Sequence, residues 1–203
     1  MADKYQNKYR IPSARLSTWD YSSNAAYFIT LCTAKRQHYF GKIINGEMQL
    51  SNIGEKAHEC WMNIPNHFQF VLLDAFVVMP NHMHGIIIID KPVNDGGVVE
   101  TGHALSLQGE TKRPAEQQSQ SDMLQSKQPH PRFRNQGKNT ISAMVGSFKS
   151  AVTKWCNENK LPFGWQSRFH DHIIRDNDEF HRIRNYILNN PANWNNDKFF
   201  SLP

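Results

Sequence analysis

The hydrophobic positions of the chain follow two periodicities, one typical of strands and one typical of helices. Runs rich in β-branched and aromatic residues predict five strands, at 27–33, 47–50, 70–79, 82–90 and 169–174. Three helices are predicted where apolar residues recur every three or four positions, at 51–64, 140–159 and 176–190. This order of elements predicts an α+β fold in which helices pack on one side of an antiparallel sheet. A ferredoxin-like split β-α-β core fits it best.

Polar residues and prolines mark the ends of the predicted helices. Ser51 is placed to cap the first helix, and Pro65 follows its end. Asp176 and Glu179 have the spacing of a capping box, which opens the last helix, and Pro191 stops it. The tail beyond Pro191 carries aromatic residues, which we expect to pack back on the body.

The stretch at about 92–136 lacks either periodicity. It has few aromatic residues, many glutamines, scattered proline, glycine and serine, and charges that cancel. It is too long for an ordinary connection between elements. We therefore predict a flexible insertion in a single domain that spans residues 1–203.

Composition and charge limit the classes of protein that fit. Of the 203 residues, 39% are hydrophobic and 20% are charged, which is typical of a globular protein. Lysine and arginine number 23 against 18 acidic residues, and the net charge of +5 permits a polyanionic partner. Three widely spaced cysteines argue against a disulfide framework. With no apolar run long enough to cross a bilayer and no signal peptide, we expect a cytoplasmic protein without membrane contact.

The sharpest local motif is His82-Met83-His84 on a predicted strand. Alternate residues of a strand share a face, so the two imidazoles lie about 6–7 Å apart along it. Two imidazoles at this spacing can bind one divalent metal ion, while Met83 packs in the core. Taken alone, the motif is more typical of two histidines on a half-exposed strand face without a ligand.

Tyr186 and Asn190 lie four residues apart on the last predicted helix and so share a face. A phenolate can act as a nucleophile, and an amide oxygen can complete a metal site begun by two histidines. The simpler interpretation is a core tyrosine between Ile183 and Ile187. In that interpretation Asn190 is part of the signal that ends the helix.

Several blocks together resemble the insertion-sequence-200-like transposases, above all the REP-associated tyrosine transposases, which are single-tyrosine HUH endonucleases. The blocks are MPNHMHG, WQ-x₃-HDHIIRD and YI-x-NNP, in that order along the chain. The resemblance covers most of residues 10–200 except the stretch near 92–136. It implies the HUH endonuclease fold.

The resemblance also implies roles for the matching residues. His82 and His84 correspond to the metal ligands, Tyr186 to the nucleophile, and Asn190 to a third metal ligand. The implied reaction is site-specific cleavage and rejoining of single-stranded DNA at hairpins or repeats, through a 5′-phosphotyrosine. The implied metal is Mg²⁺ or Mn²⁺, and no nucleotide cofactor is expected. One departure is His170, where relatives often have an aromatic residue. His170 and His172 repeat the HxH spacing and could bind metal in vitro.

Basic residues are candidates for contacts with the DNA strand, although each is also typical of a solvated surface. The candidates are Lys149, Lys154, Arg168, Arg175, Arg10 and Arg15. We expect a monomer rather than a homodimer.

Two other functions compete with the enzyme. The first is a domesticated, catalytically inactive protein that binds DNA hairpins. Retention of the histidine pair, Tyr186 and Asn190 argues against it. The second is an unrelated metallohydrolase, for which the sequence shows no further histidine or aspartate ligand near the pair and gives Tyr186 no role.

Overall fold

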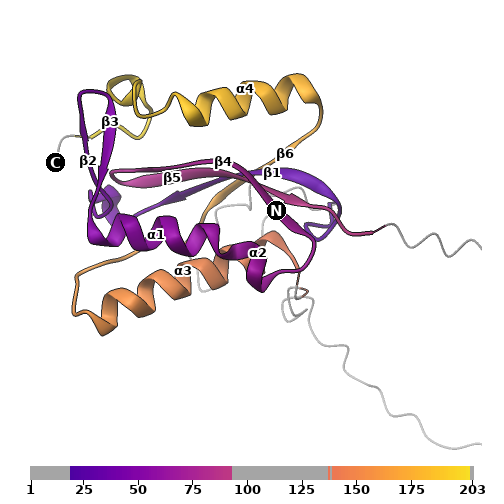
Figure 1. Ribbon diagram of the computed structural model, residues 1–203, viewed down its shortest axis with the longest axis horizontal. Coiled ribbons are helices and arrows are strands. Elements are labelled where there is room, and N and C mark those ends of the chain that lie inside the picture. Colours follow the sequence, from indigo (N-terminus) through magenta and orange to yellow (C-terminus); the bar gives the residue numbers. More distant parts are fainter. Residues whose placement is uncertain (1–18, 93–136, 138, 202–203) are drawn as a thin grey trace, which may run out of the picture. The chain divides into compact units, whose positions relative to one another are not determined.

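Four antiparallel strands form the main sheet. The computed structural model describes residues 19–92, 137 and 139–201, and the strand order is β4-β5-β1-β6 (Figure 1). The strands are β1 (Ala25–Cys32), β4 (Val71–Met79), β5 (His82–Ile89) and β6 (His170–Ile174). β5 lies between β1 and β4, and β1 lies between β5 and β6, which is the split β-α-β arrangement. The predicted ferredoxin-like α+β fold is therefore confirmed.

The helices cover both faces of this sheet. α1 (Asn52–Met62), α2 (Ile64–His67) and α3 (Ile141–Glu158) lie on one face, and α4 (Asn177–Leu188) lies on the other (Figure 1). The expectation of helices on one side only was wrong for α4. Ile183 and Ile187 form an apolar stripe on α4, and Ile86 of β5 and Ile174 of β6 bury it from the sheet side.

Alternation along β5 sends successive side chains into two separate cores. Met83 and Ile87 enter the larger core with Trp61 of α1 and Phe148 of α3. Gly85 also points to this side, where an added Cβ atom would come within 2.4 Å of the Trp61 ring. Only glycine fits there without moving Trp61 or the strand, directly beside the histidine motif.

A short hairpin lies beside the sheet. It pairs β2 (Gly41–Ile44) with β3 (Glu47–Leu50) around the predicted turn at Asn45 and Gly46. The sequence predicted β3 but missed β2. Pro65 follows the end of α1, as predicted, and lies in the first turn of the short α2. Residues 93–136, where the insertion was predicted, lie outside the described residues. Among the described helices, none combines the length and apolarity that crossing a membrane requires.

Each long helix begins at a polar cap. Ser51, Thr140 and Asp176 accept hydrogen bonds from backbone N–H groups three residues ahead, at 3.1, 3.3 and 2.8 Å. At α4 the predicted capping box takes an altered form. The Glu179 carboxylate accepts from the backbone N–H of Arg175 at 3.1 Å, and it also binds His172 of β6 at 2.9 Å. Glu179 thus ties the start of α4 to the sheet.

Replacing Glu179 by glutamine should destabilise the protein at neutral pH and much less in acid. The Arg175 N–H group and then His172 lower the pKa of Glu179. Its stabilising contribution is therefore present above the unfolded-state pKa and is lost as pH falls through the lower folded-state pKa. We expect a loss of about 1 kcal/mol at neutral pH, measured by urea unfolding. Glu158→Gln, at the exposed end of α3, should leave the free energy of unfolding nearly unchanged.

Candidate active site

His82 and His84 lie side by side on the face of β5 that α4 covers. Their ring centroids are 4.6 Å apart, and Met83 between them points into the opposite core. The predicted shared face is therefore confirmed. The alternative of a half-exposed strand face is wrong, because both histidines are 0% exposed.

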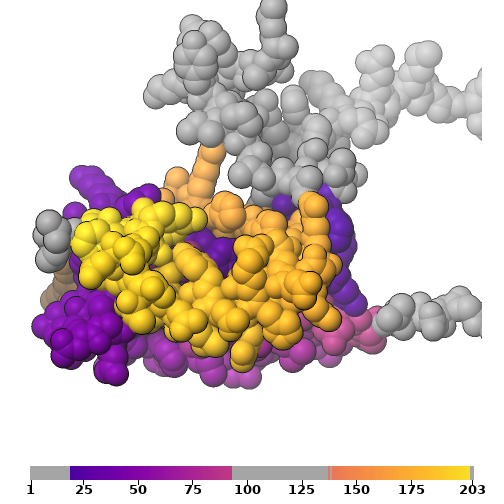
Figure 2. Space-filling view, turned by 90° about the horizontal axis from the view of Figure 1, so that it is seen from above, coloured from indigo at the N-terminus to yellow at the C-terminus, as the bar shows by residue number. Residues whose placement is uncertain are grey.

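The histidines are buried because residues 194–201, here called the covering segment, fold back over them. The chain turns after α4 and enters the short helix η3 (Trp194–Asn196). The Phe199 ring lies 4.6 Å from the His82 ring, and Trp194 stacks near His82 at 6.0 Å and 28°. The expectation that the tail packs on the body is confirmed. Figure 2 looks onto this face, with α4 in orange and yellow and the covering segment in yellow.

Hydrogen bonds fix which nitrogen of His82 carries its proton. The Asn81 amide nitrogen donates to the carbonyl oxygen of Phe199 at 2.9 Å, so the Asn81 oxygen faces His82 Nδ1 at 2.8 Å. An amide oxygen only accepts, so Nδ1 must hold the proton and Nε2 a lone pair. Nε2 is buried and has no hydrogen-bond partner among the described residues. Burial, and then the charges of Arg36 and Lys198, lower the pKa of His82 to about 3, which keeps the ring neutral.

His84 lies between a threonine and Tyr186. Its Nδ1 is 2.9 Å from the Thr30 hydroxyl, which can donate or accept, and its ring stacks on Phe28 at 5.2 Å. Its Nε2 is 3.2 Å from the Tyr186 hydroxyl. Burial and then the neighbouring His82 lower the pKa of His84 well below its usual value. Both imidazoles are therefore neutral, the form that binds metal ions.

Tyr186 comes from α4 and points at this pair. It is 39% exposed, and its hydroxyl donates to Asp197 Oδ2 at 3.1 Å. Burial and the Asp197 carboxylate raise the pKa of Tyr186 to about 12. The phenol is thus protonated at neutral pH, partly open to solvent, and already bonded to a carboxylate that can accept its proton.

Asp197 of the covering segment is a site residue that the sequence analysis missed. Its Oδ2 accepts from Tyr186 and from the Asn190 amide at 2.9 Å, and its Oδ1 accepts from the Phe199 N–H at 2.6 Å. The signal that could have found it is its place between Trp194 and Phe199, whose burial holds the loop against the body. Asp197 also supplies the aspartate that the metallohydrolase alternative had lacked.

The donor set fits a divalent metal ion. One ligand atom each of His82, His84 and Asp197 can be chosen so that all lie within 4.8 Å of one another. Asn190 is 2% exposed, and its side-chain oxygen is buried without a partner among the described residues, like His82 Nε2. Two unsatisfied buried acceptors beside a carboxylate are costly unless a cation engages them. Mixed nitrogen and oxygen donors are compatible with Mg²⁺, Mn²⁺ or Zn²⁺.

Asn81 orients His82, so its loss should weaken metal binding. We expect Asn81→Ala to lower Mn²⁺ affinity about 10- to 100-fold in calorimetric titration. Asn81→Asp keeps an acceptor for the His82 Nδ1 proton and should retain more affinity than the alanine variant. Asn66→Ala, at an exposed position of α2 away from the site, should bind like the wild type. Equal Mn²⁺ affinity in Asn81→Ala and wild type would show that His82 needs no such support.

A polar groove opens beside the Tyr186 hydroxyl. Its volume is about 340 Å³, and it is lined mainly by asparagine side chains together with one arginine. The lining residues are Arg182, Asn185, Tyr186, Asn189, Asn190, Asn193, Asn196 and Asp197. Such a lining offers hydrogen-bond donors and acceptors to a polar substrate.

The predicted DNA-contacting lysines lie away from this groove. Lys149 and Lys154 belong to α3, on the sheet face opposite α4 (Figure 1). Lys149 donates to the Gln166 carbonyl at 2.6 Å and lies over the Trp165 ring. Arg168 lies two residues before β6 and Arg175 directly after it, and Arg10 and Arg15 lie outside the described residues. The structure thus brings together His82, His84, Tyr186 and Asn190, but not the lysines.

The second HxH motif has another environment. His172 pairs with Glu179 at the start of α4 rather than with a metal-ligand cluster. Among the residues that the structure describes, the one group of three potential ligands is the one formed by His82, His84 and Asp197.

Comparison with known proteins identifies the fold and one relative. No family model matches the sequence. A solved structure described as a REP-associated tyrosine transposase bound to a REP hairpin aligns over 90% of this chain and 73% of that one, with a TM-score of 0.52 and 16% identity. This likeness shows the fold. An uncharacterized protein of Haemophilus influenzae is 37% identical over 189 residues, which cover 93% of this chain and 92% of the relative. The chain belongs to the same protein family as this Haemophilus influenzae protein.

Proposed function

We propose that the protein is a metal-dependent, site-specific endonuclease and strand transferase for single-stranded DNA at hairpins or repeats. The observation that carries this proposal is the Tyr186 hydroxyl, which is held 3.2 Å from His84 and 3.1 Å from Asp197, above two buried, neutral histidines. The fold shared with a transposase that was solved with a REP hairpin supports DNA as the substrate. A polar groove beside the hydroxyl gives the strand a place to lie.

The chemistry is a transfer of one phosphoryl linkage. Tyr186 Oη attacks the scissile phosphorus, and its proton passes to Asp197 Oδ2, the acceptor already in place. A new phosphorus–Oη bond forms, and the bond to the 3′-oxygen breaks. The products are a 5′-phosphotyrosine and, after the 3′-oxygen takes up a proton, a free 3′-OH. A 3′-OH can later attack the phosphotyrosine and rejoin a strand, so no nucleotide cofactor is needed.

His82, His84, Asp197 and Asn190 are the residues that would hold the divalent metal, Mg²⁺ or Mn²⁺. When bound, the ion supplies Lewis acidity at the scissile phosphate and helps to position it. Two cationic side chains lie beside the histidine pair. Arg36 and Lys198 lie over the Phe199 ring at 4.9 and 4.8 Å, and both act electrostatically on His82. They would attract the phosphate backbone of the strand.

Contacts away from the site stay predictions. Lys149 and Lys154 adjoin a second hollow beside Trp165, where a basic side chain over an aromatic ring suits a nucleic-acid strand. Arg168, Arg175, Arg10 and Arg15 are proposed as further contacts with the DNA backbone. The monomeric state and the cytoplasmic location also stay predictions.

The proposal is tested by looking for the covalent intermediate. Single-stranded hairpin DNA from the flanks of the gene, labelled on the side 3′ to the expected break, is incubated with the protein and Mn²⁺ or Mg²⁺. We expect a protein-linked band on a denaturing gel, which EDTA abolishes. A labelled product without a protein-linked band would contradict the tyrosine mechanism. Binding without any cleavage would support the inactive DNA-binding alternative.

A metallohydrolase is the second candidate, because Asp197 gives the histidine pair a third ligand of the type that such enzymes use. It would release both DNA fragments free of protein, and it would not depend on the Tyr186 hydroxyl. The same gel distinguishes the two reactions.

A further inference from the structure

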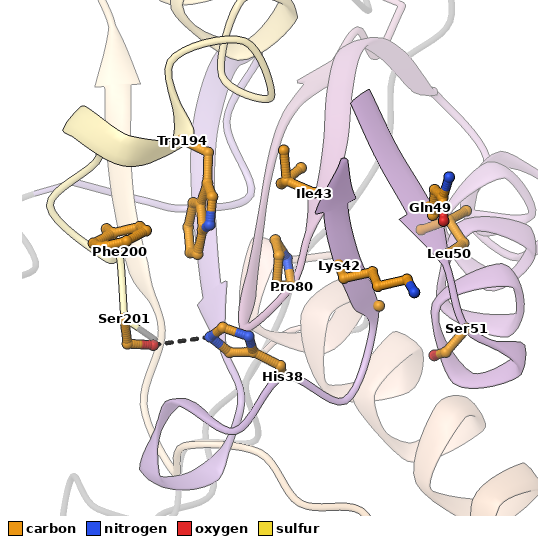
Figure 3. A pocket seen from close by; sticks show the side chains of 11 residues that line it. His38, Lys42, Ile43, Gln49, Leu50, Ser51, Pro80, Trp194, Phe200 and Ser201 are labelled. Atoms are coloured by element: carbon orange, nitrogen blue, oxygen red, sulfur yellow. Dashed lines mark hydrogen bonds between the residues drawn. The ribbon is translucent and has the colours of Figure 1, made fainter. Parts of the chain in front are cut away.

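A further hollow, separate from the one beside Trp165, lies beside Trp194, whose ring also stacks near His82. It has a volume of about 510 Å³, within the range of ligand sites, and it separates the β2–β3 hairpin from the covering segment. Figure 3 shows Trp194, Phe200 and Ser201 on one side, Ile43 and Pro80 in the middle, and Lys42 with Gln49 on the hairpin side. We call this hollow the hairpin pocket.

The walls of the hairpin pocket suit a flat ring. The Trp194 and Phe200 rings lie 5.4 Å apart at 67°, so they form two sides of a corner, and Ile43 and Pro80 add apolar surface. Phe200 is 39% exposed, which leaves ring surface free for stacking. Stacking on an aromatic side chain is the main way in which proteins hold unpaired bases without reading a duplex.

Polar groups at the rim suit the rest of a nucleotide. Lys42 is exposed on β2, and Gln49 opposite it on β3 can donate and accept hydrogen bonds at a base edge. His38 and Ser201 are joined by a hydrogen bond of 2.9 Å, which ties the covering segment to the body (Figure 3). None of the described residues that line the pocket carries a carboxylate. The charge of the pocket thus favours an anionic ligand over a cationic one.

The hairpin pocket adjoins the candidate active site through shared aromatic side chains of the covering segment. Trp194 is a wall of the pocket and also stacks near the His82 ring. Phe200 in the pocket directly follows Phe199, which packs on both histidines. A strand whose phosphate lies beside Tyr186 could therefore place a neighbouring base in the pocket.

We propose that the hairpin pocket binds one unpaired nucleobase of the DNA strand that Tyr186 cleaves, stacked against Phe200, with Lys42 at the adjoining phosphate. This inference rests on the proposed function and makes it more specific. It assigns recognition of a base near the break to the β2–β3 hairpin and the covering segment.

The test compares strands with and without bases. Fluorescence anisotropy in EDTA measures binding of labelled oligothymidylate and of a sugar–phosphate strand of the same length that lacks bases. The wild type should prefer oligothymidylate. Phe200→Ala should weaken its binding about tenfold and leave binding of the baseless strand unchanged. Phe200→Tyr, which keeps a ring for stacking, should bind like the wild type.

Phe70→Ala is the matched control. Phe70 is 37% exposed, close to the value for Phe200, and its carbonyl pairs with Asp90 beyond the opposite end of β5 from His82. This variant should bind oligothymidylate like the wild type. Lys42→Ala should reduce the slope of log affinity against log salt concentration by about one. This reduction should be the same for oligothymidylate and for the baseless strand.

Two results would overturn the inference: equal wild-type affinity for both strands, or unchanged oligothymidylate binding by Phe200→Ala. Either would leave an apolar segment of a protein as the better occupant. Failure here is separate from failure of the proposed function. A protein-linked band with no base preference would reject only the pocket. A base preference lost in Phe200→Ala, without any protein-linked band, would reject only the tyrosine chemistry.

Discussion

Replacement of Tyr186 by phenylalanine is expected to lower DNA cleavage by about 10⁴-fold or more and to abolish the protein-linked band. The substitution removes the one oxygen that points at both His84 and Asp197, and it leaves the ring that packs edge-on near Phe28. The fold and the groove should therefore persist. DNA affinity in EDTA should stay within about threefold of the wild-type value. Single-turnover cleavage on denaturing gels measures the first quantity, and anisotropy measures the second.

Tyr39→Phe provides the control for this variant. Tyr39 is half-buried and packs against Phe163, away from the histidine pair, so its hydroxyl has no part in the proposed chemistry. It should cleave at the wild-type rate. A protein-linked band that persists in Tyr186→Phe would mean that another side chain is the nucleophile.

The second large effect concerns the histidine pair. Mn²⁺ at a hundredfold excess over its dissociation constant should stabilise the wild type by about 2.7 kcal/mol. For a protein of this size that raises Tm by roughly 5–10 °C. His82→Ala and His84→Ala should lose this rise, because each removes a buried neutral nitrogen that faces Asp197 or Tyr186 across the site. Thermal unfolding with and without Mn²⁺ gives the change in Tm that the ion causes in each variant. A variant that is less stable without the ion can therefore still be compared with the wild type.

His170→Ala is the matched substitution for this experiment. His170 lies on β6 in register with Thr30 of β1, which in turn pairs with His84, so it lies on the same side of the sheet. It should keep the full Mn²⁺-dependent rise. A rise lost in His170→Ala but kept in His82→Ala would move the metal to the other HxH motif.

Local patterns predicted much of the sheet and part of the site. The alternation of β5 placed Met83 in the core and His82 beside His84, because the two-residue period of a strand depends on no distant contact. Tyr186 and Asn190 lie on the same side, as their four-residue spacing predicted, although α4 ends at Leu188 and Asn190 lies in the turn after it. β2 escaped prediction because four residues of mixed polarity carry too little periodicity.

Long-range packing decided what the sequence did not reveal. The complete burial of the histidines depends on Phe199, more than a hundred positions away, and no periodicity links the two. Asp197 lies after a turn of η3, outside any regular element, so its carboxylate had no predicted direction. Lys149 lies opposite α4 because α3 packs on the other face of the sheet. The periodicity of one helix does not indicate which face of a sheet the helix will cover.

The division of the interior into two cores has a consequence for how this family can evolve. Most buried apolar residues pack beneath the sheet with α1 and α3, whereas α4 rests on a small cluster around Ile86, Ile174, Ile183 and Ile187. Most of the buried apolar surface thus lies on one face of the sheet, and the candidate active site lies on the other. Substitutions that retune the groove or the hairpin pocket need not disturb the residues that hold the sheet together. A change in the ligand that the site accepts can therefore arise on an unchanged scaffold.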